Sequence, residues 1–359
     1  MKLSIVIPAY NEEDRIALTL EKYYNFFSKK LNKDFEILVV LNNCSDKTNK
    51  VVHNFWKAKN KPRNFCSYII HGYCGKGAAV MKGFEIVNGD LIGFVDADNS
   101  VRPEEFWKLV KNIEDADGII SSRKVKGAKI IPPRGWKENL SSNLFTGFTR
   151  KLFRMQYADT QCGGKLFINI AAKHLLKNYT ENGWIFDVDL LWLCKQANMK
   201  IKEQPIMWTD CAGGSVTVWS GIKSVFQLIN YRIKKIPDVF RFLFVGGMAT
   251  LIDILMFNVY FLTSGIFILS RFGGIVTSMI WNFIMNKKFT FASDGEITWE
   301  LPRWLIVYAA AMGSNAILST LTYNTIGPGG IEANIAAVLG LVISLPIAYL
   351  GSKYWIFKT

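Results

Sequence analysis

Short apolar runs alternate with segments of helical spacing along the first hundred residues. Four runs have the length of buried strands: residues 3–8, 35–41, 68–71 and 91–95. Three segments between them carry apolar residues at helical spacing: residues 15–27, 47–57 and 78–87. Strands that alternate with helices in this way predict an α/β domain whose mostly parallel sheet is covered on both faces.

The last third of the chain has a different pattern, four long apolar stretches. They are residues 239–262, 266–285, 304–323 and 333–352. Each is about 20 residues long, enough to cross a hydrocarbon core of about 30 Å as a helix. The sequence therefore predicts an α/β domain at residues 1–218 and an all-α, four-helix transmembrane domain at residues 238–359.

The segment between these two domains, residues 219–237, has apolar residues at helical spacing with basic residues among them. This amphipathic pattern is typical of a helix that lies on a membrane surface. An ordinary helix packed on the α/β domain is the alternative. Because the segment directly precedes the first apolar stretch, we expect an interfacial helix.

Composition supports a membrane protein and indicates its orientation. Half of the residues are hydrophobic and the mean hydropathy is +0.15, which excludes a disordered or collagen-like chain. Lys and Arg residues cluster before the first stretch, between the second and third, and after the fourth, whereas the opposite side has only Arg271. The positive-inside rule then predicts that both termini and the α/β domain are cytoplasmic. The short strand pattern that follows Lys2 predicts no cleavable signal.

The six cysteines all lie in the first 211 residues and form no CxxC pair. This pattern disfavours a metal cluster or a disulfide framework and favours a reduced compartment.

One acidic residue, Asp253, falls within the first apolar stretch. Intramembrane acids are often functional, so Asp253 is a candidate site residue. The alternative, which we favour, is a structural contact with a polar neighbour such as Asn258 or Asn282. Arg271 lies near the end of its stretch, from which it can snorkel to the membrane surface.

Polar residues follow the predicted strands, at the edge where open α/β sheets bind ligands. Tyr10 and Glu12 follow the first strand, Asn42 and Asp46 the second, and the residues from 96 to 98 the fourth. Asp96 and Asp98 flank a small residue, and paired carboxylates of this kind can hold Mg²⁺ or Mn²⁺ against a diphosphate. The turn Gly75-Lys76-Gly77 is similar to a phosphate-binding turn, although a simple tight turn is the alternative.

A basic run with no acid in it follows this region, and it consists of Arg123, Lys124, Lys126, Lys129, Arg134 and Lys137. It can be a solvated surface, a nucleic-acid site or a site for an anionic lipid head group. The chain has no nucleic-acid motif and carries membrane stretches, so we expect the lipid or phosphate partner and no nucleic acid.

Taken together, these motifs resemble family 2 glycosyltransferases of GT-A (Rossmann-like) fold, in the group that uses dolichyl or polyprenyl phosphate. The similar segments are residues 7–13, 41–48, 75–79, 96–98, 122–123, 159–165 and 186–189. The ending of the second apolar stretch, residues 286–291, is similar to that of GtrA-like membrane domains. The resemblance covers nearly the whole chain.

The resemblance implies roles for individual residues. Donor and nucleotide contacts are expected at Pro8, Tyr10, Glu12, Asn42, Asp46, Lys76, Gly77, Asp96 and Ala97. The expected metal ligands are Asp96, Asp98 and Ser100, where the family often has Gln in the place of the serine. Acceptor phosphate is expected at Arg123, Arg134, Lys137 and Ser141. Asp98, Asp187 and Asp189 are the catalytic candidates, although a structural role is an equal alternative for Asp187 and Asp189.

The expected activity is the metal-dependent, inverting transfer of a hexose from a GDP- or UDP-sugar to dolichyl or polyprenyl phosphate at the bilayer. One alternative is a transferase for another acceptor, such as a lipid-linked saccharide or a diacylglycerol. A second is a glycolipid flippase or a membrane-recruiting module, in which transfer is secondary.

Overall fold

The computed structural model describes residues 2–72, 74–209, 218–326 and 330–357. The chain divides into two compact units, Met1–Arg232 (unit 1) and Ile233–Thr359 (unit 2), and each is described by itself.

Unit 1 is built on a seven-stranded sheet of order β3-β2-β1-β4-β7-β5-β8. Its strands are β1 Leu3–Ala9, β2 Phe35–Asn42, β3 Phe65–Ile70, β4 Leu91–Phe94, β5 Gly118–Ser122, β7 Lys165–Ile168 and β8 Ile201–Pro205. All neighbours are parallel except β7, which runs antiparallel to both β4 and β5. Two short strands, β6 Lys129–Ile131 and β9 Met207–Thr209, form a second, parallel sheet. The predicted α/β class is confirmed.

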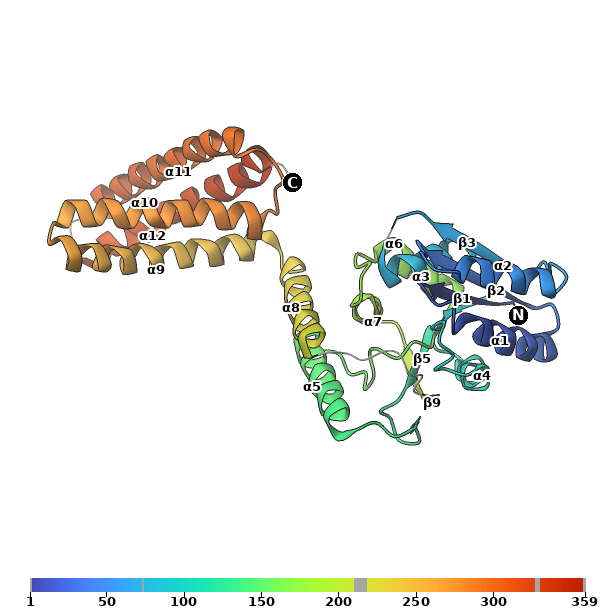
Figure 1. Cartoon of the computed structure of the whole chain (residues 1–359). Helices are drawn as coiled ribbons and strands as arrows, with labels where there is room; N and C mark the ends of the chain where they lie inside the picture. Colours follow the sequence, from blue (N-terminus) through green and yellow to red (C-terminus); the bar gives the residue numbers. More distant parts are fainter. Residues whose placement is uncertain (1, 73, 210–217, 327–329, 358–359) are drawn as a thin grey trace. The chain divides into compact units, whose positions relative to one another are not determined.

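Helices lie on both faces of the main sheet (Figure 1), and their side chains form two apolar layers against it. The helices of unit 1 are α1 Ile16–Leu31, α2 Thr48–Ala58, α3 Gly75–Ile86, α4 Pro103–Asn112, α5 Trp136–Phe153, α6 Asn169–Asn178, α7 Phe186–Gln196 and α8 Val218–Lys234. One layer receives the apolar faces of α1, α2 and α4, and the other receives those of α3, α6 and α7. Side chains of alternate residues along β1 enter opposite layers, as strand geometry requires.

The amphipathic segment predicted before the membrane stretches forms α8. Its residues Leu228 and Tyr231 are buried in the second layer of unit 1, whereas Phe226 is exposed. One face of α8 therefore packs as an ordinary helix. The expected contact of its other face with a membrane surface stays a prediction.

Unit 2 consists of four long helices that form two hairpins, the first helix with the second and the third with the fourth (Figure 1). They are α9 Asp238–Ser264, α10 Phe267–Met285, α11 Ile297–Ile326 and α12 Gly330–Gly351, with the π-helical turns η1 Asn286–Thr290 and η2 Ser352–Ile356 after α10 and α12. All four are long and apolar enough to cross a membrane. The four predicted stretches are thus confirmed as long apolar helices, and the cytoplasmic position of the termini stays a prediction.

The two structural partners that we expected for Asp253 are wrong. Asp253 forms an ion pair with Arg271 (Nη1 to Oδ2, 2.7 Å), whereas Asn258 donates to the Ile254 carbonyl and Asn282 bonds Tyr308 on another helix. The expected snorkelling of Arg271 is wrong for the same reason, because its guanidinium turns toward this acid.

Candidate functional site

The turn after β4 carries the two aspartates at the carboxyl edge of the sheet. Ala97 is buried, and its carbonyl accepts a hydrogen bond from the Thr19 hydroxyl of α1 (2.6 Å). Asp98 Oδ1 accepts the backbone N–H of Ser100 (2.8 Å). These bonds fix a turn that displays Asp96 and Asp98 with only a buried alanine between them.

A row of alternating charges runs from Asp96 into the core. Lys76, at the start of α3, lies 2.6 Å from Asp96 Oδ1 and 3.9 Å from Asp187 Oδ2. The other oxygen of Asp187 accepts a hydrogen bond from Lys165 of β7, whose side chain is wholly buried and also donates to the Cys162 carbonyl (2.7 Å). Two cations therefore hold Asp187, and Lys76 joins it to the aspartate turn.

The two aspartates of the turn differ in their acidity. Burial opposes ionisation of Asp96, but the nearby Lys76, and more weakly Lys165 and Arg123, outweigh it and lower the pKa of the carboxyl. Burial and the neighbouring charge of Asp96 raise the pKa of Asp98. A cation bound between them would lower both values, so the pair is electrostatically prepared to receive positive charge.

The residues present fit a divalent cation at this turn. The Ser100 hydroxyl is buried beside the Asp98 carboxyl, and no other hydrogen-bond partner is found for it among the described residues, so an expected ligand atom faces the turn. Within the described ranges no group of three or more His, Cys, Asp or Glu side chains converges. Such a cation would take its other ligands from phosphate and water, as Mg²⁺ commonly does.

The loops after β1 and β2 are joined to each other beside this turn. The Glu12 N–H donates to Thr48 (2.7 Å), and the Glu13 N–H donates to Asp46 (3.1 Å). Burial raises the pKa of Glu12 despite its ion pair with Arg15 (2.7 Å). Because β1 pairs in parallel with both β2 and β4, these loops and the aspartate turn lie at the same edge of the sheet, and the charges of Asp96 and Asp98 contribute to the raised pKa of Glu12.

The expected donor residues are placed differently within this site. Tyr10 is half exposed, which suits contact with a base. Pro8 is buried in β1. Asn42 is also buried, and its side chain accepts a hydrogen bond from the Cys74 N–H (3.2 Å) and donates one to the Gly75 carbonyl (3.0 Å). Asn42 thus holds the glycine turn in place, and its contact with a nucleotide stays a prediction.

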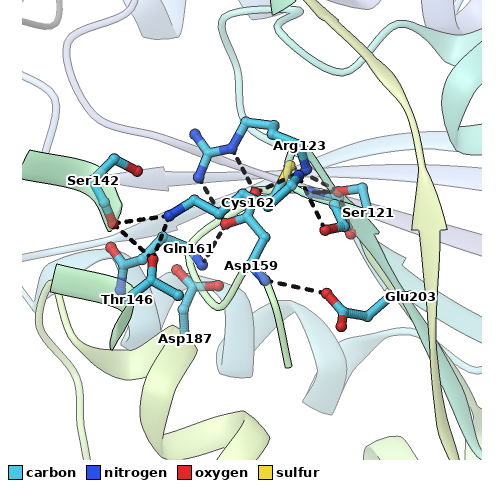
Figure 2. Close-up of polar contacts among 12 residues, drawn as sticks. Ser121, Arg123, Ser142, Thr146, Asp159, Gln161, Cys162, Asp187 and Glu203 are labelled. Carbon is cyan, nitrogen blue, oxygen red and sulfur yellow. Dashed lines mark hydrogen bonds and ion pairs between the residues drawn. The ribbon is translucent and has the colours of Figure 1, made fainter. Parts of the chain in front are cut away.

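The predicted acceptor residue Arg123, at the end of β5, forms a two-pronged ion pair with Asp159 (Figure 2). Its Nε and one Nη lie 2.7 and 2.9 Å from the two Asp159 oxygens. The pair lowers the pKa of Asp159 to about 2 against the effect of burial, and it raises the pKa of Arg123. The second Nη of Arg123 has no hydrogen-bond partner in the described part of the chain, so the guanidinium can still bind an anion.

Trp208 of β9 brings a second basic residue to Arg123. The guanidinium carbons of Arg134 and Arg123 lie 4.5 and 5.4 Å from the centre of its ring. Ser141 is exposed on α5, and no contact joins it to this pair. The side chain of Lys137 lies outside the described part of the structure.

The catalytic candidates Asp187 and Asp189 lie in different surroundings. Asp187 faces Lys76 and the aspartate turn, as described above. Asp189 is buried, and its oxygens accept the backbone N–H groups of Thr180 and Glu181 (2.8 and 2.9 Å) and the hydroxyl of Tyr231. This arrangement favours the structural alternative for Asp189.

The prediction of site residues from the sequence missed several that the structure brings in. Lys165 and Asp159 lie in a segment that the resemblance had matched, but their roles depend on partners far away in the chain. Gly163 allows close approach, because a Cβ there would lie 2.0 Å from Asp96 Oδ2. No sequence signal marks Trp208 as part of the site, or Tyr231 as the partner of Asp189.

A mostly parallel sheet with acidic, glycine-rich and cationic loops at one edge is typical of α/β proteins that bind their ligands at the carboxyl ends of the strands. The chain belongs to glycosyl transferase family 2, whose model matches residues 4–174, and its residues 241–357 match the GtrA/DPMS transmembrane domain. The expected family, the GT-A fold class and the membrane domain are therefore confirmed, and the protein is a glycosyltransferase.

Curated relatives span most of the chain. A dolichyl-phosphate beta-glucosyltransferase of Trichomonas vaginalis is 30% identical over 64% of this chain and 73% of its own length. The dolichyl-phosphate beta-glucosyltransferase of Saccharomyces cerevisiae is 30% identical over 67% of this chain and 76% of its own. Among solved structures, glucosyl-3-phosphoglycerate synthase of Mycobacterium tuberculosis with Mn²⁺ and UDP-glucose is 16% identical, with a TM-score of 0.46 over 64% of this chain and 77% of that one.

Proposed function

We propose that this protein transfers glucose from a nucleotide-diphosphate sugar to dolichyl phosphate or another polyprenyl phosphate. The relatives named above support this acceptor and this sugar by their names. Within the chain, the single observation that carries the proposal is the position of one loop, which pairs with Arg123 through Asp159 and packs against Asp96 at Gly163, where a Cβ would lie 2.0 Å from Asp96 Oδ2. It brings a cationic site for one anion within reach of an acidic turn suited to a metal diphosphate.

On the donor side, Asp96 and Asp98, with Ser100 as the third candidate, would hold Mg²⁺ or Mn²⁺. When bound, this ion neutralises the diphosphate and makes it a better leaving group. Lys76 lies 2.6 Å from Asp96 and adds a positive charge at the same place. UDP is our first expectation for the nucleotide, because UDP-glucose is a common activated form of glucose, and GDP is the alternative.

On the acceptor side, Arg123 and Arg134 would hold the lipid phosphate. A phosphate monoester is mostly ionised at neutral pH, so its oxygen can attack without a strong base. A bond then forms between that oxygen and the anomeric carbon, and the bond from this carbon to the diphosphate oxygen breaks. In-line attack inverts the anomeric centre and releases the nucleoside diphosphate. The protein supplies position and charge stabilisation.

Incubation of the purified full-length chain with lipid phosphate and single nucleotide sugars tests the proposal. Transfer from UDP-glucose to polyprenyl phosphate, in the presence of Mn²⁺ or Mg²⁺, is the expected result, with a product that mild acid hydrolyses. Retention of activity in excess chelator would contradict the metal assignment. A product formed on diacylglycerol but not on polyprenyl phosphate would support the other lipid acceptor instead.

A further inference from the structure

The membrane unit is a duplicated helical hairpin. Residues of α9 and α11 correspond at an interval of 62, so that Asp238 matches Glu300 and Arg241 matches Arg303. The second helices, α10 and α12, correspond at an interval of 66, so that Lys287 matches Lys353. The same interval separates η1 from η2. Each hairpin therefore begins with an acid and an arginine and ends with a lysine in a π-helical turn.

The contacts of the structure repeat with the same intervals. Lys287 of the first hairpin pairs with Glu300 of the second. In the matching contact, Lys353 of the second hairpin pairs with Asp238 of the first. Two aromatic contacts also join the hairpins at matched positions, Phe283–Trp304 and Phe242–Tyr349. In each contact the ring centres lie 5.6 Å apart. Arg241 and Arg303 each donate to a carbonyl in the π-turn of their own hairpin. A local two-fold relation thus joins the hairpins, so matched positions are expected to carry similar residues. Where one hairpin has a charged residue and the other has a neutral one, packing alone does not require the charge.

Asp253 is such a charged residue. A Cβ on Gly274 of α10 would lie 3.0 Å from Asp253 Oδ1, and a Cβ on the matching Gly340 of α12 would lie 2.7 Å from Asn315 Oδ1. The same close helix crossing is therefore built with Asp253 in one hairpin and with the neutral, equally large Asn315 in the other. The packing of the hairpin does not need the charge.

The arginine that pairs with Asp253 is directed into the membrane unit. Ser264 and Ser270 are joined by a hydrogen bond of 3.1 Å, which sets the end of α9 level with the start of α10. Arg271 lies one residue beyond Ser270, yet its guanidinium reaches Asp253, which precedes Ser264 by 11 residues or about 16 Å along the helix. Snorkelling to the nearer end of the helix would draw it the opposite way.

The pair leaves hydrogen-bonding capacity unused. Arg271 donates to Asp253 through one nitrogen, and its other N–H groups have no partner among the described residues. The Asp253 side chain is 17% exposed, its Oδ1 atom has no partner in the described part of the structure, and the Arg271 side chain is 46% exposed. Ile268 and Phe272 beside it are exposed apolar residues of a predicted membrane span. Hydrocarbon offers these N–H groups no acceptor, so leaving them bare is costly.

We propose that Asp253 and Arg271 form a receptor for the phosphate of a lipid that approaches the outer face of the first hairpin. A guanidinium binds phosphate oxygens through paired N–H groups, and a lipid brings its phosphate along the apolar surface that flanks Arg271. Asp253 holds Arg271 in place and competes with the phosphate for it, so the bound lipid can exchange. This site is separate from the sugar-transfer site, and the inference does not depend on the proposed function.

Photo-crosslinking of the full-length chain tests the receptor without reference to activity. The probe is phosphatidic acid with a photoactivatable group near its phosphate, and the matched uncharged probe is the corresponding diacylglycerol. We expect the phosphatidic acid to label residues 267–275, as mapped by peptide mass spectrometry. Competition with unlabelled phosphatidylglycerol or polyprenyl phosphate then distinguishes the two lipid sources. Equal labelling by the two probes would overturn the proposal.

Variants separate a receptor from a purely structural ion pair. Arg271→Gln should lower labelling about tenfold, as expected for loss of a charged hydrogen bond, whereas Asp253→Asn should raise it because the competing carboxylate is gone. Arg303→Gln, in the other hairpin, is the matched control and should leave labelling of residues 267–275 unchanged. If Arg271→Gln does not fold, the double variant Arg271→Gln with Asp253→Asn takes its place. It removes both charges, so that this position is neutral, as at Asn315 of the second hairpin. Unchanged labelling in either variant lacking Arg271 contradicts the receptor.

Discussion

The two units of the molecule stabilise buried charge in different ways. In unit 1 the charges are shared, since Lys76 contacts two carboxylates and Asp187 contacts two lysines. In unit 2 the ion pairs are single, since Asp253 pairs with Arg271, Lys287 with Glu300 and Lys353 with Asp238. The shared row lies at the edge of a sheet where an anionic substrate can enter, whereas the Asp253–Arg271 pair lies on a helix surface that faces apolar surroundings.

This difference teaches where each unit can accept a ligand. A shared row can rearrange its contacts when a cation or a diphosphate arrives, because Lys76 and Asp187 at its centre each have a second partner of opposite charge. A single pair in hydrocarbon cannot, and the N–H groups that it leaves bare are the feature that a phosphate would satisfy. The first arrangement suits a reaction that moves charge, and the second suits simple binding.

Breaking the buried end of the shared row should have the largest effect. Lys165→Met leaves Asp187 buried with only Lys76 at 3.9 Å to balance it, so we expect unit 1 to lose about 3 kcal/mol of unfolding free energy. Chemical unfolding of the full-length chain, followed by a signal from unit 1, measures the loss. Lys108→Met breaks the more exposed pair with Glu105 and is the control, with an expected loss below about 1 kcal/mol. Equal losses of unfolding free energy in the two variants would show that burial of the Lys165–Asp187 pair does not increase its contribution to stability.

Removal of one turn aspartate should reduce chemistry without reducing stability. Asp98→Ala takes away an expected metal ligand whose charge is costly to bury, and we expect transfer to fall by about 10²- to 10³-fold. Initial rates at saturating donor and lipid phosphate measure the change, and a melting curve verifies the fold. Asp14→Ala, in an exposed position, should retain full activity. Full activity of the Asp98 variant would disprove the metal assignment.

The sequence predicted the regular part of the fold well because apolar periodicity determines it. The first four parallel strands and the four membrane helices lie within three residues of their predicted ranges, except that α11 begins at Ile297, seven residues before its predicted start. The antiparallel strand β7 was not predicted, since three apolar residues after a lysine do not reveal the partner or the direction of a strand. Its insertion between β4 and β5 is nonetheless what carries Lys165 into the site.

The site was predicted less completely, because spacing places residues on an element but does not choose their partners. Asp187 and Asp189 are two residues apart on α7, about 200° around the helix, and so face different surroundings. Sequence similarity offered both as catalytic candidates, and only the structure distinguishes them. The same limit explains why Arg271 was not recognised as the partner of Asp253, 18 residues earlier in the chain.

A change at the cationic site should affect one substrate more than the other. Arg123→Ala removes the guanidinium proposed to hold lipid phosphate, so we expect KM for this substrate to rise about tenfold and KM for the donor to change little. Steady-state kinetics with each substrate varied in turn provides the measurement. Lys126→Ala, an exposed member of the same basic run, is the matched control. Because Asp159 would lose its partner, Arg123→Lys should also be tested, and equal effects on both substrates in both variants would argue against the acceptor site.

The smallest expected effect is a difference in stability loss between variants of the two ion pairs that join the hairpins of unit 2. Lys287 and Glu300 are 12% and 4% exposed, whereas the matching Lys353 and Asp238 are 28% and 23% exposed. Lys287→Met leaves a buried carboxylate and should cost about 1 to 2 kcal/mol, between the limits for exposed and buried pairs. Lys353→Met leaves an acid that water reaches and should cost less. Melting temperatures of the two variants in one detergent make the comparison, and a larger loss for Lys353→Met would show that burial does not rank the two pairs.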